Sequence, residues 1–345
     1  MSTAWSVSSA GQWNHFAAAH PDANLLQAGS WGDLKARYGW RVTRLAVGGA
    51  DAPRGGVQIL TRTRRIPPLG PSIGLAYMPR GPLAKSDADA RALIAAASEE
   101  ARRLGASLLR VEPVCARHAT VLTALGFRQT DAFVQIPRTA VVDLDADDAA
   151  LLGSFKPKMR YNIRLAARRG VEVEMDSSEA GFDAFYQLTA ATAARQGFAV
   201  HAASYYQDVA RTFGDDAALF VARFEGRALA ALMAVAFGPE AVYLYGASSD
   251  AERGRMAPHA TQWAAMQWAR TRGCRHYDMW GMANPDDPGD PMAGVHRFKL
   301  GFNPRLVEYP GTYDLPLQRV RAWALTSGAL RARAALQRWR GRPQN

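Results

Sequence analysis

The segment Asp87–Val111 reads DADARALIAAASEEARRLGASLLRV, and it decides the fold class. Asp87 is a capping residue before a long run of helix formers, and Gly105 follows as a stop signal, so the spacing predicts a helix over 87–104. The short apolar run Leu108–Val111 then predicts a buried strand. Strands are also expected before the helix, at Arg41–Val47, Gly56–Thr63 and Ser72–Tyr77.

The second half of the chain repeats this order. A helix is expected over Pro258–Arg272, stopped by Gly273, and a short strand over His276–Met279. Strands are expected before that helix, at Leu219–Phe224, Leu229–Phe237 and Ala241–Tyr245. Matching residues of the two halves lie 168 positions apart, for example Gly105 and Gly273. Agreement in order, spacing and residue type indicates a duplication.

Within the first half, a second helix over Arg117–Leu125 ends at Leu125-Gly126-Phe127, and a strand over Val134–Leu144 follows. The order of these elements resembles that of an acyl-CoA N-acyltransferase-like (GNAT) unit: a strand hairpin, a long helix, a short strand, a second helix and a strand. We therefore expect an α/β (α+β) protein of two tandem GNAT-like domains, over 1–145 and 146–315. A basic amphipathic helix over 316–345 is expected to pack back on the first domain.

Composition excludes several classes of protein. The chain has 345 residues, 48% of them hydrophobic and 21% charged, which suits two globular domains. Its longest apolar run, Ala228–Phe237, is much shorter than the roughly 20 residues of a membrane span. The N-terminus shows no secretory signal. Cys115 and Cys274 are too few for a disulfide scaffold or a zinc site, and such scarcity suits the cytosol.

Positive charge is clustered along the chain. The net charge is +11, and the stretch Leu151–Val171 carries six basic residues and no acid. The stretch Leu315–Asn345 carries seven arginines and no acid. Such blocks favour polyanionic partners, namely RNA, anionic lipid or a phosphorylated substrate.

Several motifs resemble the FemABX peptidyltransferases, which extend the stem peptide of peptidoglycan precursors with amino acids taken from aminoacyl-tRNA. The basic helix KPKMRYNIRLA at Lys156–Ala166 is one of them. The others are Tyr245–Ser249 with Tyr277-Asp278-x-x-Gly281, RFKLGF at Arg297–Phe302, YPGTYDL at Tyr309–Leu315 and, more weakly, Tyr77–Pro82. No segment corresponds to the coiled-coil arm of longer members, so the chain resembles the compact FemX-like form.

The resemblance places Phe298 and Lys299 at the catalytic position. Aminoacyl transfer from an ester to an amine passes through a tetrahedral oxyanion, which a fixed cation stabilises. Lys299 is also unusual in itself, because the chain has only five lysines among 42 basic residues. A lysine kept where arginine is the default favours a compact point charge. The alternative is a surface lysine at the end of a helix.

The resemblance also implies a set of substrate-binding residues. Lys35, in Trp31-Gly32-Asp33-Leu34-Lys35, matches a lysine that binds substrate phosphate. A second cation is expected four residues before a tyrosine, and that spacing gives His201 before Tyr205 where the family has arginine. Tyr205 and Tyr245 either donate hydrogen bonds to substrate or cover the edge of the core. The full set is Lys35, Arg80, Arg195, His201, Tyr205 and Tyr245.

Two further groups complete the predicted site. Glu112 is expected either to accept or orient a proton of the attacking amine, or to form a salt bridge with Arg110 or Arg117. The basic helix is expected to contact the phosphates of the tRNA acceptor end, with a solvated basic face as the alternative. Its candidate residues are Lys156, Lys158, Arg160 and Arg164.

The sequence contains no motif that indicates a metal site, a cofactor or a covalent nucleophile. The seven histidines form no recognisable ligand pair, and neither a GxSxG elbow nor a GxxxxGK[ST] loop occurs. The expected protein is a cytoplasmic, monomeric aminoacyltransferase without metal or coenzyme. It would contact the inner membrane face peripherally and move an amino acid from aminoacyl-tRNA to the side-chain amine of the diamino acid in a UDP-linked or lipid-linked muropeptide.

Two rival functions remain open. A CoA-dependent N-acyltransferase acting on a small amine would bind pyrophosphate through an [RQ]-x-x-G-x-[GA] loop that follows a strand. The nearest match, Arg102-x-x-Gly105-x-Ser107, instead follows a helix. A non-catalytic RNA-binding module would explain the charge but not the motifs at 298–302 and 309–315.

Overall fold

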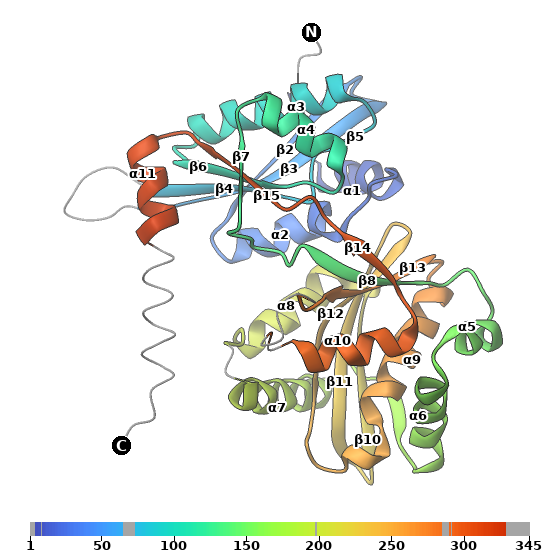
Figure 1. Cartoon of the computed structure of the whole chain (residues 1–345). Helices are drawn as coiled ribbons and strands as arrows, with labels where there is room; N and C mark the ends of the chain where they lie inside the picture. The colour runs from blue at the N-terminus through green and yellow to red at the C-terminus, as the bar shows by residue number, and fades with distance from the viewer. Residues whose placement is uncertain are drawn as a thin grey trace, which may run out of the picture. The chain divides into compact units, whose positions relative to one another are not determined.

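The computed structural model describes residues 4–7, 9–64, 73–196, 199–284, 290 and 292–328 (Figure 1). The chain divides into two compact units. The first comprises Met1–Asp22, Leu26–Gln135 and Tyr309–Asn345, and the second comprises Ala23–Leu25 and Ile136–Glu308.

The first unit is built on a mixed sheet with the strand order β1-β2-β3-β4-β6-β15-β7, and β5 pairs with β3. Strands β2, β3 and β4 are antiparallel to one another, whereas β4 and β6 run parallel. The strands are β1 (Trp5–Ser6), β2 (Arg41–Gly48), β3 (Pro53–Arg64), β4 (Ile73–Pro79), β5 (Leu83–Ala84), β6 (Leu108–Glu112), β7 (Arg128–Thr130) and β15 (Thr312–Pro316).

Helices cover both faces of this sheet. Helices α3 (Asp87–Arg103) and α4 (Ala116–Ala124) lie over one face, and α1 (Ala10–Ala19) and α2 (Gly29–Arg37) lie over the other (Figure 1). The N-cap of the long helix α3 is Ser86, one residue before the expected Asp87. The Ser86 hydroxyl accepts a hydrogen bond from the backbone amide of Asp89 at 3.1 Å. Buried alanine and leucine side chains of α3 then form one core with the sheet.

The second unit repeats the arrangement. Its sheet has the order β14-β8-β13-β12-β11-β10-β9, and β12 and β13 are the parallel pair. The strands are β8 (Arg138–Asp143), β9 (Glu172–Met175), β10 (Ala217–Phe224), β11 (Arg227–Phe237), β12 (Glu240–Ser248), β13 (His276–Gly281) and β14 (Arg305–Glu308).

The helices of the second unit also occupy both faces of their sheet. Helix α9 (Ala257–Thr271), which connects the parallel strands, packs on one face together with α5 (Asp148–Ser154) and α6 (Pro157–Arg168). Helices α7 (Glu179–Gln196) and α8 (Ala203–Phe213) lie on the other face (Figure 1). Helix α10 (Ala293–Lys299) precedes β14. The order predicted from the repeat is therefore present in both units.

The two halves of the sequence exchange one strand each. Strand β8 follows the first unit along the chain but pairs with β13 and β14 of the second sheet. Strand β15 follows the second unit but pairs with β6 and β7 of the first. In the first sheet β15 lies between β6, the second strand of the parallel pair, and the short edge strand β7. In the second sheet β8 lies in the same way between β13 and β14.

This exchange corrects the expected domain boundaries at 145 and 315. The second unit begins at Ile136, and the first resumes at Tyr309. A buried ion pair fixes β15 in the first sheet, because Arg110 binds Asp314 through two bonds of 2.8 and 2.7 Å. Local sequence patterns predict that a strand forms, but they do not predict in which of the two similar sheets it pairs.

The described part of the expected C-terminal helix is short. Helix α11 (Arg319–Trp323) continues into a π-helical turn over Ala324–Gly328. Ala322 is buried, while Val320 and Trp323 are 81% and 67% exposed. Residues 329–345 of that expectation lie outside the described residues.

Candidate active site

Lys299 is the last residue of α10, and its side chain is buried, with only 3% exposed. Its ammonium donates hydrogen bonds to two consecutive carbonyl oxygens at the end of β13. The distances are 2.7 Å to Gly281 O and 3.2 Å to Trp280 O. A buried lysine bound by carbonyls is not the surface lysine of the alternative interpretation.

The two carbonyls converge because β13 is distorted there. Trp280 has a φ of +65°, which is uncommon for a bulky residue, and the pairing with β8 shifts register between Asp278 and Gly281. Asp278 supports the distortion: it accepts the Trp280 amide at 2.7 Å and the hydroxyl of Thr139. A backbone conformation of this cost persists only where the surroundings enforce it.

Burial changes the protonation behaviour of Lys299. Desolvation lowers the pKa of its ammonium to about 8, although the Asp278 carboxylate opposes the shift. Two of the three ammonium protons are bound by carbonyls, and among the residues the structure describes the third has no acceptor. The ring of Tyr243 lies 5.8 Å away, and burial raises the pKa of that phenol to about 12. The site therefore offers a cationic donor beside a neutral phenol.

Phe298 has a packing role next to this lysine. Its ring meets His259 and Phe302 edge to face, at centroid distances of 5.1 and 5.4 Å. His259 is in turn close to the amide of Asn162 on α6, with 3.1 Å between Nε2 and Nδ2. Burial lowers the pKa of His259 to about 4, so the ring is neutral. Phe298 thus positions the end of α10, and the chain of contacts reaches the basic helix.

Four of the predicted substrate-binding residues gather near the end of β12. The His201 ring stacks on Tyr205 at a centroid distance of 3.9 Å, and the Tyr245 hydroxyl donates to the Tyr205 hydroxyl at 3.3 Å. Arg195 binds the Ser248 carbonyl and, at 3.1 Å, Asp250. Tyr205 is buried whereas His201 is exposed.

Lys35 and Arg80 belong to the first unit. Lys35 lies over the Trp31 ring at 4.3 Å, and burial lowers the pKa of its ammonium to about 8. Arg80 is buried, has a φ of +50° and places its guanidinium 3.5 Å from the centre of the Tyr309 ring. Its backbone amide donates to the Glu112 carbonyl at 2.7 Å.

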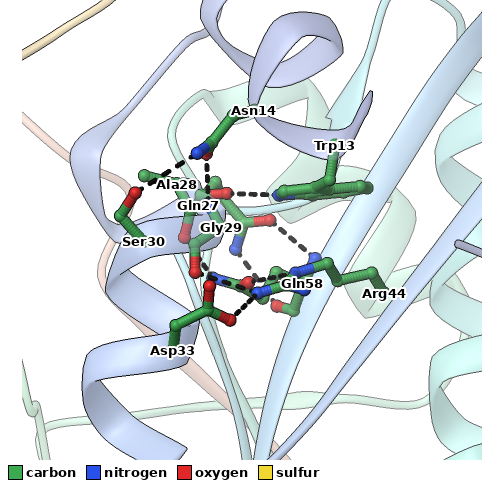
Figure 2. A network of polar contacts seen from close by, with 9 residues as sticks. All are labelled: Trp13, Asn14, Gln27, Ala28, Gly29, Ser30, Asp33, Arg44 and Gln58. Carbon is green, nitrogen blue, oxygen red and sulfur yellow. Dashed lines mark hydrogen bonds and ion pairs between the residues drawn. The ribbon is translucent and has the colours of Figure 1, made fainter. Parts of the chain in front are cut away.

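A buried polar network supports both residues (Figure 2). Arg44 on β2 donates to the side chain of Gln58 at 2.9 Å, to the Gly29 carbonyl at 2.9 Å and to Asp33 at 2.7 Å. This ties the first turns of α2, which carries Lys35, to the sheet. Gln27 extends the network, because its amide donates to the carbonyl of Pro79, next to Arg80, at 2.6 Å. The sequence did not predict these supporting residues. Arginine is rarely buried unless it is paired, and the partners that allow Arg44 to be buried cannot be read from the sequence.

Glu112 has neither of its expected roles. Its carboxylate is 1% exposed and accepts the amide of Val134 at 2.6 Å, the amide of Gln135 at 3.1 Å and the hydroxyl of Thr312 at 3.2 Å. It also accepts the hydroxyl of Tyr77. A carboxylate saturated by four donors has no free lone pair for proton transfer.

The salt bridge expected for Glu112 is also absent among the described residues. Arg110 binds Asp314 instead, and Arg117 donates to the carbonyls of Ala84 and Lys85. Glu112 therefore connects β6 to the segment entering the second unit and to β15.

The basic helix α6 presents three of its four predicted cations to solvent. Lys156, Lys158 and Arg164 are exposed. Arg160 instead turns back and donates to the carbonyls of Gly153 and Phe155 at the end of α5. Arg160 is therefore not presented to solvent with the other candidate cations, because the carbonyls at a helix end need donors.

Two features are absent from the described part of the chain. No group of three or more His, Cys, Asp or Glu side chains lies close enough together to hold a metal ion. No helix there combines the length and the apolar character needed to cross a membrane.

Two solved structures show the fold of this chain. A crystal structure of FemX superposes with a TM-score of 0.83 at 23% identity, covering 93% of this chain and 99% of that one. A tandem GNAT protein from the clavulanic acid biosynthesis pathway gives a TM-score of 0.55 at 16% identity over 91% of this chain and 98% of that one. The fold is therefore that of two tandem GNAT-like domains, as predicted.

The FemAB family model matches residues 117–228 and 225–327, and the chain belongs to the FemAB family. Curated relatives named lipid II:glycine glycyltransferase are 26% identical. The match to the Staphylococcus saprophyticus protein runs over 379 aligned residues and covers 88% of this chain and 90% of the relative. The match to the Staphylococcus aureus (strain USA300) protein runs over 386 residues with the same coverages. The resemblance inferred from the motifs is thereby confirmed.

We expect Glu112→Gln to lower the free energy of unfolding by about 1–3 kcal/mol, because the amide turns one acceptor into a donor facing other donors. Denaturant unfolding measures the change. Glu308→Gln is the matched control, since the Glu308 side chain is 67% exposed in its pair with Arg138 and should change little. Equal stability of the two variants would mean that the Glu112 carboxylate is not held as described.

Proposed function

We propose that the protein is an aminoacyltransferase that moves an amino acid from aminoacyl-tRNA to the side-chain amine of the diamino acid in a peptidoglycan precursor. Membership of the FemAB family supports this function, and so do relatives named for glycyl transfer to lipid II. The observation that carries the proposal is the buried ammonium of Lys299, with two protons bound and one available.

The chemistry needs little beyond positioning and charge. The acceptor amine forms a C–N bond to the ester carbonyl carbon, and the carbonyl oxygen becomes negative. The third N–H of Lys299 is the donor for this oxygen, in a site where burial strengthens the interaction. Collapse of the intermediate breaks the C–O bond to the tRNA ribose, and the proton lost by the amine goes to that leaving oxygen. The ester is already activated, which agrees with the absence of a free base at Glu112.

Acceptor recognition is proposed for the cations and phenols of each unit. A UDP-linked or lipid-linked muropeptide carries a diphosphate, which cations bind well. Lys35 and Arg80 would serve in the first unit, and Arg195 and His201 in the second. The Tyr205–Tyr245 pair offers hydroxyl groups for the sugar or peptide. His201 stands where the resemblance expects an arginine, and its ring N–H would donate a hydrogen bond to a phosphate oxygen.

A lipid-linked acceptor would also bring the protein to a membrane surface. Helix α11 presents Val320 and Trp323 to solvent, with Arg319 and Arg321 beside them in sequence. Apolar and basic side chains together suit the surface of an anionic bilayer. We propose α11 as the peripheral contact.

Removing the Lys299 ammonium should slow transfer strongly. Purified protein is incubated with a mixture of charged tRNAs and either precursor, and the mass gain of the precursor names the amino acid. Lys299→Met should slow transfer by at least about 10²-fold with unchanged circular dichroism. The acceptor amine attacks as the free base and the Lys299 ammonium is the active form, so wild-type transfer should rise with pH and then level off above about 8, the pKa of Lys299. Whatever activity Lys299→Arg retains should keep rising above that pH, since arginine stays charged.

Other outcomes of this assay contradict the proposal. Near-normal transfer by folded Lys299→Met would remove the lysine from the mechanism. Acetyl transfer from acetyl-CoA to a small amine, without any mass gain from charged tRNA, would replace the proposed reaction by the rival one.

The exposed cations of α6 should give tRNA binding its dependence on salt. Replacing Lys156, Lys158 and Arg164 by Gln should weaken binding and reduce the slope of log K against log salt by about 2–3, roughly one for each lost phosphate contact. Fluorescence anisotropy with labelled tRNA over a range of KCl concentrations measures the slope. The matched control removes three exposed arginines of the first unit, Arg91, Arg102 and Arg128. An equal loss in the control would assign the binding to net charge alone.

A further inference from the structure

The first unit contains a cavity that the proposed reaction does not use. Its volume is about 960 Å³, which is the size of a small-molecule site. Residues of α1, of the turn between β2 and β3 and of the segment that leads from β5 into α3 line it, and all of them belong to the first unit. None of the candidate catalytic or substrate-binding residues is among them. The cavity is therefore a separate site.

Aromatic rings form much of the apolar lining. Trp5 and Phe16 are half-buried, and the rings of Trp13 and Phe16 are tilted against each other with centroids 5.7 Å apart. These two rings lie directly on β3, because a Cβ atom at Gly56 would be only 2.7 and 2.8 Å from them. Both indole N–H groups already donate to backbone carbonyls, at 3.1 Å for Trp5 and at 2.7 Å for Trp13. The lining therefore offers aromatic surface on which a flat apolar group can pack.

The lining also contains a buried donor without a partner. His20 is 5% exposed, and its ring centroid lies 6.0 Å from that of Phe16. Its Nδ1 accepts the backbone amide of Asp22 at 3.1 Å, so the proton of the neutral ring is on Nε2. Nε2 is buried and has no hydrogen-bond partner among the described residues. Because an unpaired buried donor is costly, this N–H favours a ligand that brings an acceptor.

A cation lies near this donor. Lys85 lines the same cavity, and among the described residues its ammonium forms no salt bridge. Its charge acts on the His20 ring: burial lowers the pKa of His20, Asp22 opposes the shift, and the positive charge of Lys85 adds to it. The neutral N–H of His20 and the ammonium of Lys85 are thus neighbouring donors, and together they suit an anionic acceptor.

The acids of the lining do not bind this ammonium. Asp89 is paired with Arg54 at 2.9 Å, so these two charges neutralise each other. Asp51 is exposed in the turn between β2 and β3, where solvent and salt screen its charge. The cavity therefore combines an aromatic surface with a pair of donors for an anion.

We propose that this cavity binds a small aromatic anion, that is, a planar ring system that carries one carboxylate or sulfonate group. The ring system packs against Trp5 and Phe16, in the offset or edge-to-face arrangements that aromatic pairs prefer. The oxygens of the anionic group accept hydrogen bonds from His20 Nε2 and from the Lys85 ammonium. The site shares no residue with the candidate active site, so it can be tested without the transfer reaction.

The test uses 8-anilinonaphthalene-1-sulfonate as a fluorescent probe with the native full-length protein. The probe is displaced by 1-naphthoate, by its neutral counterpart 1-naphthalenemethanol or by the aliphatic anion octanoate. We expect 1-naphthoate to act at a concentration at least about three-fold lower than the neutral compound, because only the anion pairs with Lys85 and His20. Equal potency of these two compounds, or stronger displacement by octanoate, would overturn the proposal without any variant.

Two variants with matched controls locate the site. Ala19 lines the cavity and is exposed, so Ala19→Trp should block the probe, whereas Ala95→Trp, at an exposed position of α3 outside the lining, should not. Lys85→Gln should weaken 1-naphthoate binding by about 2–5-fold and leave 1-naphthalenemethanol unchanged, with Arg91→Gln as the control for net charge. Undiminished probe binding by folded Ala19→Trp would place the ligand elsewhere, and unchanged 1-naphthoate binding by Lys85→Gln would remove the cation from the site; either result contradicts the proposal.

Discussion

The candidate site depends on one interaction, the binding of a buried lysine ammonium by two consecutive backbone carbonyls. Desolvating an ammonium is costly, and carbonyl dipoles offset that cost only if they converge on the nitrogen. An ordinary strand points successive carbonyls in opposite directions. The left-handed conformation of Trp280 removes this alternation, and as a result both oxygens reach Lys299.

The strand exchange contributes directly to this geometry. Thr139 lies on β8, which follows the first unit along the chain but belongs to the second sheet. Its hydroxyl binds Asp278, whose carboxylate holds the Trp280 amide and also raises the affinity of Lys299 for its proton. In the first unit, Arg110 and Asp314 fix the other exchanged strand. Each sheet therefore depends on a strand that is distant in sequence from the strands it pairs with.

Much of the fold could be predicted, because hydrophobic periodicity and glycine stop signals are local. The helices α3 and α9 and their flanking strands follow from such signals. Lys299 could be singled out because the motif at 297–302 resembles the FemABX family, and the rarity of lysine in this arginine-rich chain supported that choice. The exchanged strands, the conformation of Trp280 and the saturation of Glu112 depend on partners far away in sequence. The motif Tyr277-Asp278-x-x-Gly281 could be recognised in the sequence, but the sequence did not predict that it shapes the lysine site.

Burial weakens the hold of Lys299 on its ammonium proton. Titration of the side-chain nitrogens by NMR, in protein labelled with ¹⁵N-lysine and assigned with Lys299→Arg, tests it directly. We expect a Lys299 midpoint near 8, well below the ordinary lysine value of 10.5. A Lys299 signal that titrates at the ordinary value would place the ammonium in water and not in a buried site.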